Sequence, residues 1–374
     1  MSKKILIAPL NWGLGHATRC MPLIDELLRQ GADVMLASDG AALQLLQAEY
    51  PQLPIFQLPA YNIRYPFNSM MLSMATQMPK ILRGCLGEHF WLKKFVKTHK
   101  IDIVISDNRF GFFNKTTYNI FITHQANILI PSKWMQRWVN RVNHFFIKKF
   151  NTLWIPDFEN EPNLAGQLAH ENLPKQLTIK YLGALSRMKT PIETPKKYQV
   201  IAVLSGPEPQ RTHLENIIIE QFEKMTPPPD ELGTGQYFDS KVLENKPFLL
   251  VRGVMNDKDF NVKNKKIDIH NYLKAKELQE KIAESEVMIC RSGYSTIMDL
   301  VTLQIPAVLI PTPGQTEQEY LASELMAKNL FYTQNQDALD LDVALEKVKH
   351  YTGFGKFPNQ QETLSQIVND LLKI

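Results

Sequence analysis

Short apolar runs alternate along the chain with longer stretches in which apolar residues recur at helical spacing. Near the N-terminus, the run at residues 5–8 precedes a glycine loop, a helical pattern through Met21, Ile24 and Leu27, and a second run at residues 34–37. A strand, a helix and a strand in this order form a β-α-β unit, whose two strands lie parallel in one sheet. The pattern therefore predicts an α/β fold.

The same alternation continues through both halves of the chain. The further predicted strands are residues 101–106, 118–123, 200–204, 248–252, 287–290 and 307–310. Between the two series lies a polar, proline-bearing segment, which is typical of a linker. We therefore predict an N-terminal Rossmann-like domain at 1–183, a linker at 184–198 and a C-terminal Rossmann-like domain at 199–352. A C-terminal helix at 353–374 could pack back on the N-terminal domain.

Composition narrows the class of protein. With 374 residues, 44% of them hydrophobic and 21% charged, the chain is long enough for two or three globular domains. Three cysteines without a CxxC pair argue against a disulfide scaffold and a cysteine zinc site, and they favour a reducing cytoplasm. No apolar stretch approaches the roughly 20 residues of a membrane helix, and residues 1–9 read as a strand rather than a signal peptide.

Charge is unevenly distributed along the chain. Residues 1–182 contain 20 Lys and Arg against 12 Asp and Glu, a net +8, whereas the remainder has a net −4. A basic half is typical of proteins that meet an anionic lipid surface, a phosphorylated substrate or nucleic acid. Ordinary surface variation explains the asymmetry equally well.

The first glycine loop could serve a nucleotide or a catalytic base. It contains Gly13, Gly15 and His16, but Thr18 stands where a dinucleotide fingerprint has its third glycine. Asp39 lies where the ribose-binding acid of a dehydrogenase would lie, so that class stays open. At the start of a helix, the dipole lowers the pKa of a histidine and keeps a neutral base available. A purely structural role for His16 is the alternative.

Two further strand ends in the N-terminal half carry polar side chains. Asp107 ends one predicted strand and His124 follows the next. The carboxyl ends of parallel strands meet at one edge of a sheet, so we expect both residues near His16. His16, His124 and Asp107 are the candidate bases, and the choice among them stays open.

The strand at 287–290 leads into small polar residues at a predicted helix start. These residues are Arg291, Ser292, Gly293, Tyr294, Ser295 and Thr296, with Asp299 two turns into the helix. Backbone N–H groups and the positive end of the dipole form a cradle for a phosphate there. Asp299 could bind a ribose diol. Plain helix capping is the alternative.

The loop after the strand at 307–310 is rich in groups that bind hydroxyls. Gln315, Gln318 and Glu319 could hydrogen-bond a hexose, or could belong to a solvated loop. No P-loop, GxSxG or HExxH motif occurs. The acidic pairs at 257–259 and 340–342 do not follow convincing strands, so we expect no metal and no cofactor.

Together these motifs resemble glycosyltransferase family 28, which includes the N-acetylglucosaminyltransferase that forms lipid II, and a less characterised related branch. The resemblance runs through Gly13–Leu14–Gly15–His16, His124–Asn127, Tyr181–Arg187, Ser205–Gly206, Tyr272–Leu273, Arg291–Asp299 and Gln318–Tyr320. It implies a GT-B fold, in which two Rossmann-like domains face each other across a cleft.

The resemblance also implies a function. An inverting, metal-independent transferase would move a hexose-type sugar from a nucleotide diphosphate sugar, UDP first, to a lipid-linked or phosphorylated acceptor. It assigns donor binding to Gly13, Gly15, Arg187, Ser205, Gly206, Leu273, the residues of the phosphate cradle, Asp299, Gln315, Gln318 and Glu319. Glu319 replaces a glutamine of the family pattern, so the sugar stays open. A UDP-sugar 2-epimerase and a non-catalytic nucleotide-sugar-binding protein are the alternatives.

One helical stretch mixes aromatic and basic residues. Its members are Lys133, Trp134, Arg137, Trp138, Arg141, Phe145, Phe146, Lys148 and Lys149. They could lie on an anionic membrane at the inner face of the cell membrane, or the aromatic residues could belong to the core. We expect no nucleic-acid partner. The oligomeric state does not follow from the sequence.

Overall fold

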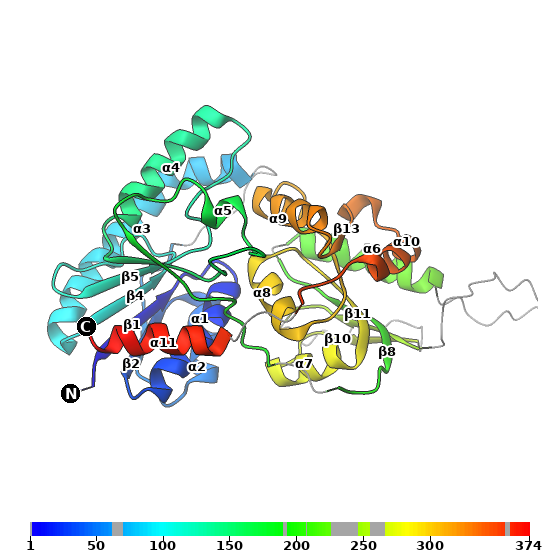
Figure 1. The fold of residues 1–374 in the computed structure, drawn as a ribbon, viewed down its shortest axis with the longest axis horizontal. Coiled ribbons are helices and arrows are strands. Elements are labelled where there is room, and N and C mark those ends of the chain that lie inside the picture. The colour runs from blue at the N-terminus through cyan, green and yellow to red at the C-terminus, as the bar shows by residue number, and fades with distance from the viewer. Residues whose placement is uncertain are drawn as a thin grey trace, which may run out of the picture. The chain divides into compact units, whose positions relative to one another are not determined.

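The computed structural model describes residues 2–61, 70–189, 193–206, 208–225, 246–254, 266–355 and 360–374 (Figure 1). Contacts divide the chain into two compact units. The first unit contains Met1–Arg187 and Phe357–Ile374, and the second contains Met188–Lys356.

The first unit is built on a seven-stranded parallel sheet in the order β3-β2-β1-β4-β5-β6-β7. Its strands are β1 (Lys4–Pro9), β2 (Asp33–Ser38), β3 (Ile55–Gln57), β4 (Ile103–Asp107), β5 (Tyr118–Ile122), β6 (Thr152–Ile155) and β7 (Thr178–Tyr181). Its helices are α1 (Gly15–Arg29), α2 (Gly40–Glu49), α3 (Met70–His99), α4 (Lys133–Ile147), α5 (Gln167–His170) and α11 (Gln360–Leu372).

The central strands of this sheet are apolar on both faces. β1 is buried from Ile5 to Pro9, and all five residues of β4 are buried. Strands covered on both sides by helices read as continuous apolar runs, which is why the sequence pattern predicts them. Their register pairs Pro9 with Asp107 and Asp107 with Ile122, so β1, β4 and β5 end side by side.

The C-terminal helix α11 belongs to the first unit, where it lies against α1 (Figure 1). The Gln30 side chain at the end of α1 donates to the carbonyl of Ser365 over 2.8 Å. Arg29 Nη2 donates to the hydroxyl of Ser365 over 3.0 Å. These bonds attach α11 to the C-terminal end of α1.

The second unit contains a six-stranded parallel sheet in the order β10-β9-β8-β11-β12-β13. Its strands are β8 (Tyr198–Val203), β9 (Phe248–Val251), β10 (Ile267–His270), β11 (Ser285–Cys290), β12 (Ala307–Leu309) and β13 (Tyr332–Thr333). Its α-helices are α6 (Gln210–Met225), α7 (Ala275–Ala283), α8 (Tyr294–Leu303), α9 (Thr316–Ala327) and α10 (Leu341–Lys347), with 3₁₀ turns η1 (Gln336–Ala338) and η2 (Val348–His350).

Strand order reverses once in each sheet. β1 lies between β2 and β4, and β8 lies between β9 and β11. In doubly wound α/β folds, ligands bind outside the carboxyl ends of the strands at such a reversal. The predicted fold class, α/β with two Rossmann-like parallel sheets, is confirmed, and the fold directs attention to the loops after β1, β4, β8 and β11.

Candidate functional site

The loop between β1 and α1 places His16 in the first turn of α1, directly beyond the edge of the sheet. Gly13 has a φ of +76°, which side-chain-bearing residues rarely adopt, and so the glycine permits the sharp turn into the helix. Gly15 opens α1 and Leu14 is its N-cap. His16 therefore lies above the ends of β1 and β4.

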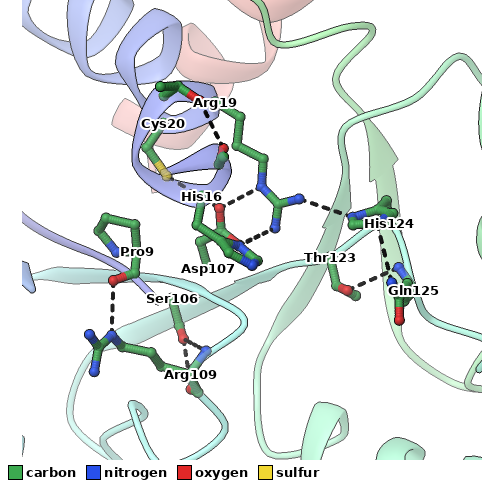
Figure 2. Close-up of polar contacts among 12 residues, drawn as sticks. Pro9, His16, Arg19, Cys20, Ser106, Asp107, Arg109, Thr123, His124 and Gln125 are labelled. Carbon is green, nitrogen blue, oxygen red and sulfur yellow. Dashed lines mark hydrogen bonds and ion pairs between the residues drawn. The ribbon is translucent and has the colours of Figure 1, made fainter. Parts of the chain in front are cut away.

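His16 and Asp107 form a hydrogen-bonded pair (Figure 2). Nδ1 of His16 lies 2.9 Å from Oδ1 of Asp107, the last residue of β4. Asp107 is fully buried, whereas 13% of the His16 side chain is exposed. A carboxylate that accepts from Nδ1–H leaves a lone pair on Nε2, and an imidazole held in this way is a general base.

Arg19 lies one turn after His16 on α1 and connects the pair to His124. Its Nε donates to Oδ2 of Asp107 over 2.6 Å, and its Nη2 contacts Oδ1 of the same carboxylate. Nη2 also lies 2.8 Å from Nδ1 of His16, and Nη1 lies 2.9 Å from Nδ1 of His124. Figure 2 shows the guanidinium between the carboxylate and His124. The structure thus brings together all three catalytic candidates from the sequence.

Burial and charge set the protonation of this cluster. Burial lowers the pKa of His16, and the positive charge of Arg19 lowers it further, against the opposing effect of Asp107. Burial alone would raise the pKa of Asp107, but Arg19 and His16 outweigh it and hold this pKa well below its usual value. At neutral pH the pair is a neutral imidazole and a carboxylate.

These pKa shifts predict how stability depends on pH. Because the pKa of His16 is lower in the folded state, the unfolded chain binds more protons below pH 6.5, and stability falls on acidification. Asp107 adds nothing between pH 7.5 and 5.5, since it is ionised in both states. We expect urea unfolding to show a larger loss between these pH values for the wild type than for His16→Gln. Equal losses would contradict a lowered pKa.

Arg19 is the functional candidate that sequence reasoning missed. Arg19 is only 2% exposed, and it lies on the buried face of α1 together with Cys20 and Leu23. An arginine within an apolar stripe, three residues after a candidate base, is the signal that could have found it. Its partners, 88 and 105 residues further along, follow only from the register of the sheet.

Asp39, the ribose-binding candidate of the dehydrogenase alternative, has a different role. It is buried and pairs with Arg109, which also contacts Glu88 and donates to the carbonyl of Pro9 over 3.0 Å. Burial raises the pKa of Glu88. This charged network joins the ends of β1 and β2 to α3, and it occupies the carboxylate that a dinucleotide would need.

In the second unit, β11 leads directly into α8, as the sequence predicts. Gly293 is the N-cap, and no side-chain hydrogen bond caps the helix within the described part of the chain. The hydroxyl of Ser292 instead donates to the carbonyl of Gln318 over 2.8 Å. Tyr294 is buried, whereas Ser295 is half-buried. Because Gly293 has no side chain, the N-cap residue itself does not cap the helix.

The remaining cradle residues divide between the start of α8 and the core. Thr296 and Asp299 are half-buried on α8. Arg291 is buried, and its guanidinium donates to the carbonyls of Ile310 and Pro311 over 3.3 and 3.2 Å. It also donates to the carbonyl of Gln210 over 2.9 Å. Arg291 therefore fixes the loops around the cradle from within.

The loop between β12 and α9 is shaped by its own amide and carboxylate side chains. Gln318 Oε1 accepts from the backbone N–H of Thr312 over 2.9 Å, and Gln318 Nε2 donates to Gln315 over 2.7 Å. Glu319 accepts from the N–H of Gly314 over 2.8 Å. The predicted sugar-binding side chains are thus held in place at the end of β12.

The other donor-binding candidates lie on loops. Ser205 and Gly206 are exposed after β8, and Leu273 is buried after β10. Arg187 ends the first unit and is half-buried, and its buried Nε has no hydrogen-bond partner among the described residues.

The remaining question for the described residues is whether any of their side chains could hold a metal ion. Among the described residues, no group of three or more His, Cys, Asp and Glu is placed to hold a metal ion. Asp340 caps α10 by accepting from the N–H of Val343 over 3.0 Å. The acidic pair at 257–259 lies outside the described residues.

Comparison with known proteins places this geometry in a class. Residues 240–371 match the sequence model of the glycosyltransferase family 28 C-terminal domain. An uncharacterized glycosyltransferase of Methanosarcina acetivorans is 23% identical, over 98% of this chain and 95% of its own.

Two further likenesses concern proteins with named activities. A UDP-N-acetylglucosamine–N-acetylmuramyl-(pentapeptide) pyrophosphoryl-undecaprenol N-acetylglucosamine transferase of Caldanaerobacter subterraneus is 32% identical, over 20% of this chain and 21% of its own. The structure of Arabidopsis thaliana UGT89C1 complexed with UDP-L-rhamnose has a TM-score of 0.60 at 12% identity, over 100% of this chain and 94% of that one.

The fold and these matches define the protein as a glycosyltransferase of the GT-B type. Over residues 240–371, its C-terminal part is similar to the C-terminal domain of glycosyltransferase family 28. The family resemblance and the enzyme class that the sequence predicts are both confirmed.

Proposed function

We propose that the protein transfers a hexose-type sugar from a nucleoside diphosphate sugar, UDP-sugar first, to an acceptor hydroxyl, with inversion and without a metal ion. The observation that carries this proposal is the buried carboxylate Asp107, which holds His16 at the carboxyl edge of the first sheet. UDP is favoured because the relative from Caldanaerobacter and the Arabidopsis structure both carry it in their names.

The reaction follows from the roles of these groups. Nε2 of His16 takes the proton of the acceptor hydroxyl while the oxygen attacks the anomeric carbon. The bond from that carbon to the diphosphate oxygen breaks, and the nucleoside diphosphate leaves with the electron pair. Attack from the face opposite the leaving group inverts the anomeric centre. Asp107 stabilises the imidazolium that forms.

The leaving group gains negative charge, which fixed dipoles can stabilise. The N-terminus of α8 presents backbone N–H groups after a strand, in the geometry that binds phosphates in α/β folds. We assign a second stabilising charge to Arg187, whose Nε has no hydrogen-bond partner in the part of the chain that the structure describes. In this proposal these two features take the place of a metal ion.

Turnover of nucleotide sugars tests the proposal. The protein is incubated with UDP-, GDP- and dTDP-sugars, with and without membrane-lipid extracts and EDTA, and the product anomer is determined by NMR. Acceptor-dependent release of nucleoside diphosphate that EDTA does not affect supports the proposal. Release of epimerised sugar without acceptor indicates an epimerase, and tight binding without turnover indicates a binding protein. A loss of turnover in EDTA overturns metal independence.

We further propose that α4 binds an anionic membrane and that the acceptor is lipid-linked or phosphorylated. The outward residues Trp134, Trp138 and Phe145 are 73%, 62% and 57% exposed, so they do not belong to the core. The inward face instead buries Asn140 and Asn143. These three aromatic side chains of α4 therefore face solvent, which is the reverse of an ordinary surface helix, whereas Phe146 is half-buried and packs against Phe110.

Hydrogen bonds explain why asparagine suits the inner face. Asn140 accepts from the N–H of Ile128 over 2.7 Å and donates to Asn127 over 2.8 Å. Asn143 donates to the carbonyls of Gln125 and Ala126 over 3.2 Å. These bonds fasten α4 to the loop that follows His124, so α4 is held rigidly while its aromatic face stays exposed.

Charge favours an anionic lipid surface as the occupant. α4 contains no acidic residue, and Arg137 and Arg141 lie exposed between its aromatic side chains. Lys149 lies 4.5 Å from the ring centroid of Phe145. Aromatic rings with interleaved cations fit the boundary between anionic headgroups and acyl chains. No helix in the described part of the chain is both long and apolar enough to span a membrane. We propose a peripheral position at the cytoplasmic face, consistent with the free thiols of Cys20, Cys85 and Cys290.

Vesicle sedimentation checks this membrane contact. We expect binding to phosphatidylglycerol vesicles but not to phosphatidylcholine vesicles. The double change Arg137→Gln with Arg141→Gln removes two cations, each worth about 1 kcal/mol, and weakens partitioning roughly 30-fold. The control pair Lys224→Gln with Lys349→Gln also removes two exposed cations, but from the second unit. Equal weakening by both pairs, or binding to neither vesicle, contradicts the proposal.

A further inference from the structure

The contact between Arg19 and His124 fixes where His124 carries its proton. Arginine stays protonated and donates from every nitrogen, so it has no lone pair to offer. Nδ1 of His124, 2.9 Å from Nη1, must therefore accept. The proton of the neutral ring then lies on Nε2. A histidine in this state can donate a hydrogen bond from Nε2 but cannot take a proton there. The side-chain amide of Gln125, whose nitrogen lies 3.5 Å from Nε2, must then turn its oxygen toward the ring.

His16 stands between two partners with opposite demands. Asp107 Oδ1, 2.9 Å from Nδ1, requires a proton on that nitrogen, whereas Arg19 Nη2, 2.8 Å away, requires a lone pair. Donation to Asp107 leaves Nε2 free to act as a base. Acceptance from Arg19 moves the proton to Nε2 and abolishes the base. Once His16 has taken a proton, both nitrogens carry hydrogen, and only Asp107 is then satisfied.

We infer that Arg19 is a positioning residue that holds His124 as an Nε2–H donor, while Asp107 keeps the proton of His16 on Nδ1 and leaves its Nε2 as the base. Asp107 is excluded from the base role because its two oxygens are occupied by His16, Arg19 and the thiol of Cys20, the last over 3.4 Å. The assignment of His16 rests on the proposed function. The proton positions do not.

The charged and titratable groups around His16 come from three elements. Arg19 and Cys20 lie on α1, Asp107 ends β4, and His124 follows β5. Burial raises the pKa of Cys20 well above its usual value, so this group stays a neutral thiol. Arg19 is therefore the cation of the cluster that opposes protonation of His16 at physiological pH.

Histidine NMR tests the proton positions without any substrate. In protein labelled with ¹⁵N-histidine, two-bond N–H correlations distinguish Nδ1–H from Nε2–H tautomers. The chain has nine histidines, so the signals of His16 and His124 are assigned by their loss from the spectra of His16→Gln and His124→Gln. We expect His124 as the Nε2–H tautomer and His16 as the Nδ1–H tautomer at pH 7.5. Nδ1–H on His124, or Nε2–H on His16, overturns the inference even if transferase activity is never found.

Two substitutions at Arg19 separate positioning from structural support. Arg19→Lys keeps the charge, but a single ammonium cannot reach three side chains as a planar guanidinium does. We expect it to release His124 from a fixed tautomer. Arg19→Met removes the charge as well, and it should move the acid limb of the kcat/KM profile to higher pH. Unchanged tautomers and an unchanged limb in Arg19→Met would refute the role. If Arg19→Met does not fold, the wild-type spectrum and Arg19→Lys still decide.

Discussion

His16→Gln is expected to lower kcat roughly 10²- to 10⁴-fold, the range that removal of a positioned general base produces. The glutamine amide fills similar space and can still contact Asp107, but it cannot take a proton. The substituted side chain lies at the edge of the first sheet, whereas we assign the diphosphate to the start of α8 and to Arg187. The dissociation constant for UDP, measured by calorimetry, should therefore stay at its wild-type value.

His213→Gln is the matched control for this prediction. His213 lies on α6 with 56% of its side chain exposed, and its Nε2 lies 3.2 Å from Oδ1 of the exposed Asp337. It should keep full turnover. An unchanged kcat in His16→Gln would remove His16 from the base role. A fall in both kcat and UDP affinity would instead point to a disturbed fold, which thermal unfolding of the variant would reveal.

The central strands of both sheets could be predicted because burial on two faces leaves an unbroken apolar run. β1, β4, β8 and β11 all have this character. Edge strands are different. β3 has three residues, two of them half-buried and one exposed, and β13 has two half-buried residues. Strands so short and so partly covered leave no run that stands out from the surrounding loops.

The periodicity of α4 predicts a helix but not its orientation. Both faces carry residues of mixed character, and an aromatic residue normally indicates the buried side. The structure buries Asn140 and Asn143 because the loop after β5 needs side chains that hydrogen-bond its backbone. That requirement depends on a loop at 125–128, twelve or more residues away in sequence. It is therefore not contained in the helical pattern.

The candidate site shows the same division between local and distant causes. His16, Asp107 and His124 could be predicted to lie together because each follows or ends a parallel strand. Arg19 could not, since its importance depends on the side chains that the sheet places opposite α1. In the second unit, Arg291 is part of the family motif, yet its Nη1 and Nη2 atoms donate to the carbonyls of the neighbouring loops. Sequence gives the residue types at a site, and packing decides which of them face a ligand.

Charge at the start of α8 provides the second large expected effect. Ser295→Asp places a carboxylate in the first turn of α8, where we propose that the diphosphate binds. Two unit charges about 6 Å apart at an effective dielectric constant of about 20 repel by about 3 kcal/mol, so UDP should bind roughly 100-fold more weakly. The same carboxylate interacts favourably with the dipole of α8, which stabilises the helix by about 0.3–1 kcal/mol, so the melting temperature should not fall.

Ser295→Asn, which matches aspartate in shape but lacks its charge, should bind UDP like the wild type. Uridine, which has no phosphate, should bind all three proteins equally. If Ser295→Asp weakens uridine as much as UDP, the loss is steric, and if it weakens neither, the diphosphate does not bind at this helix.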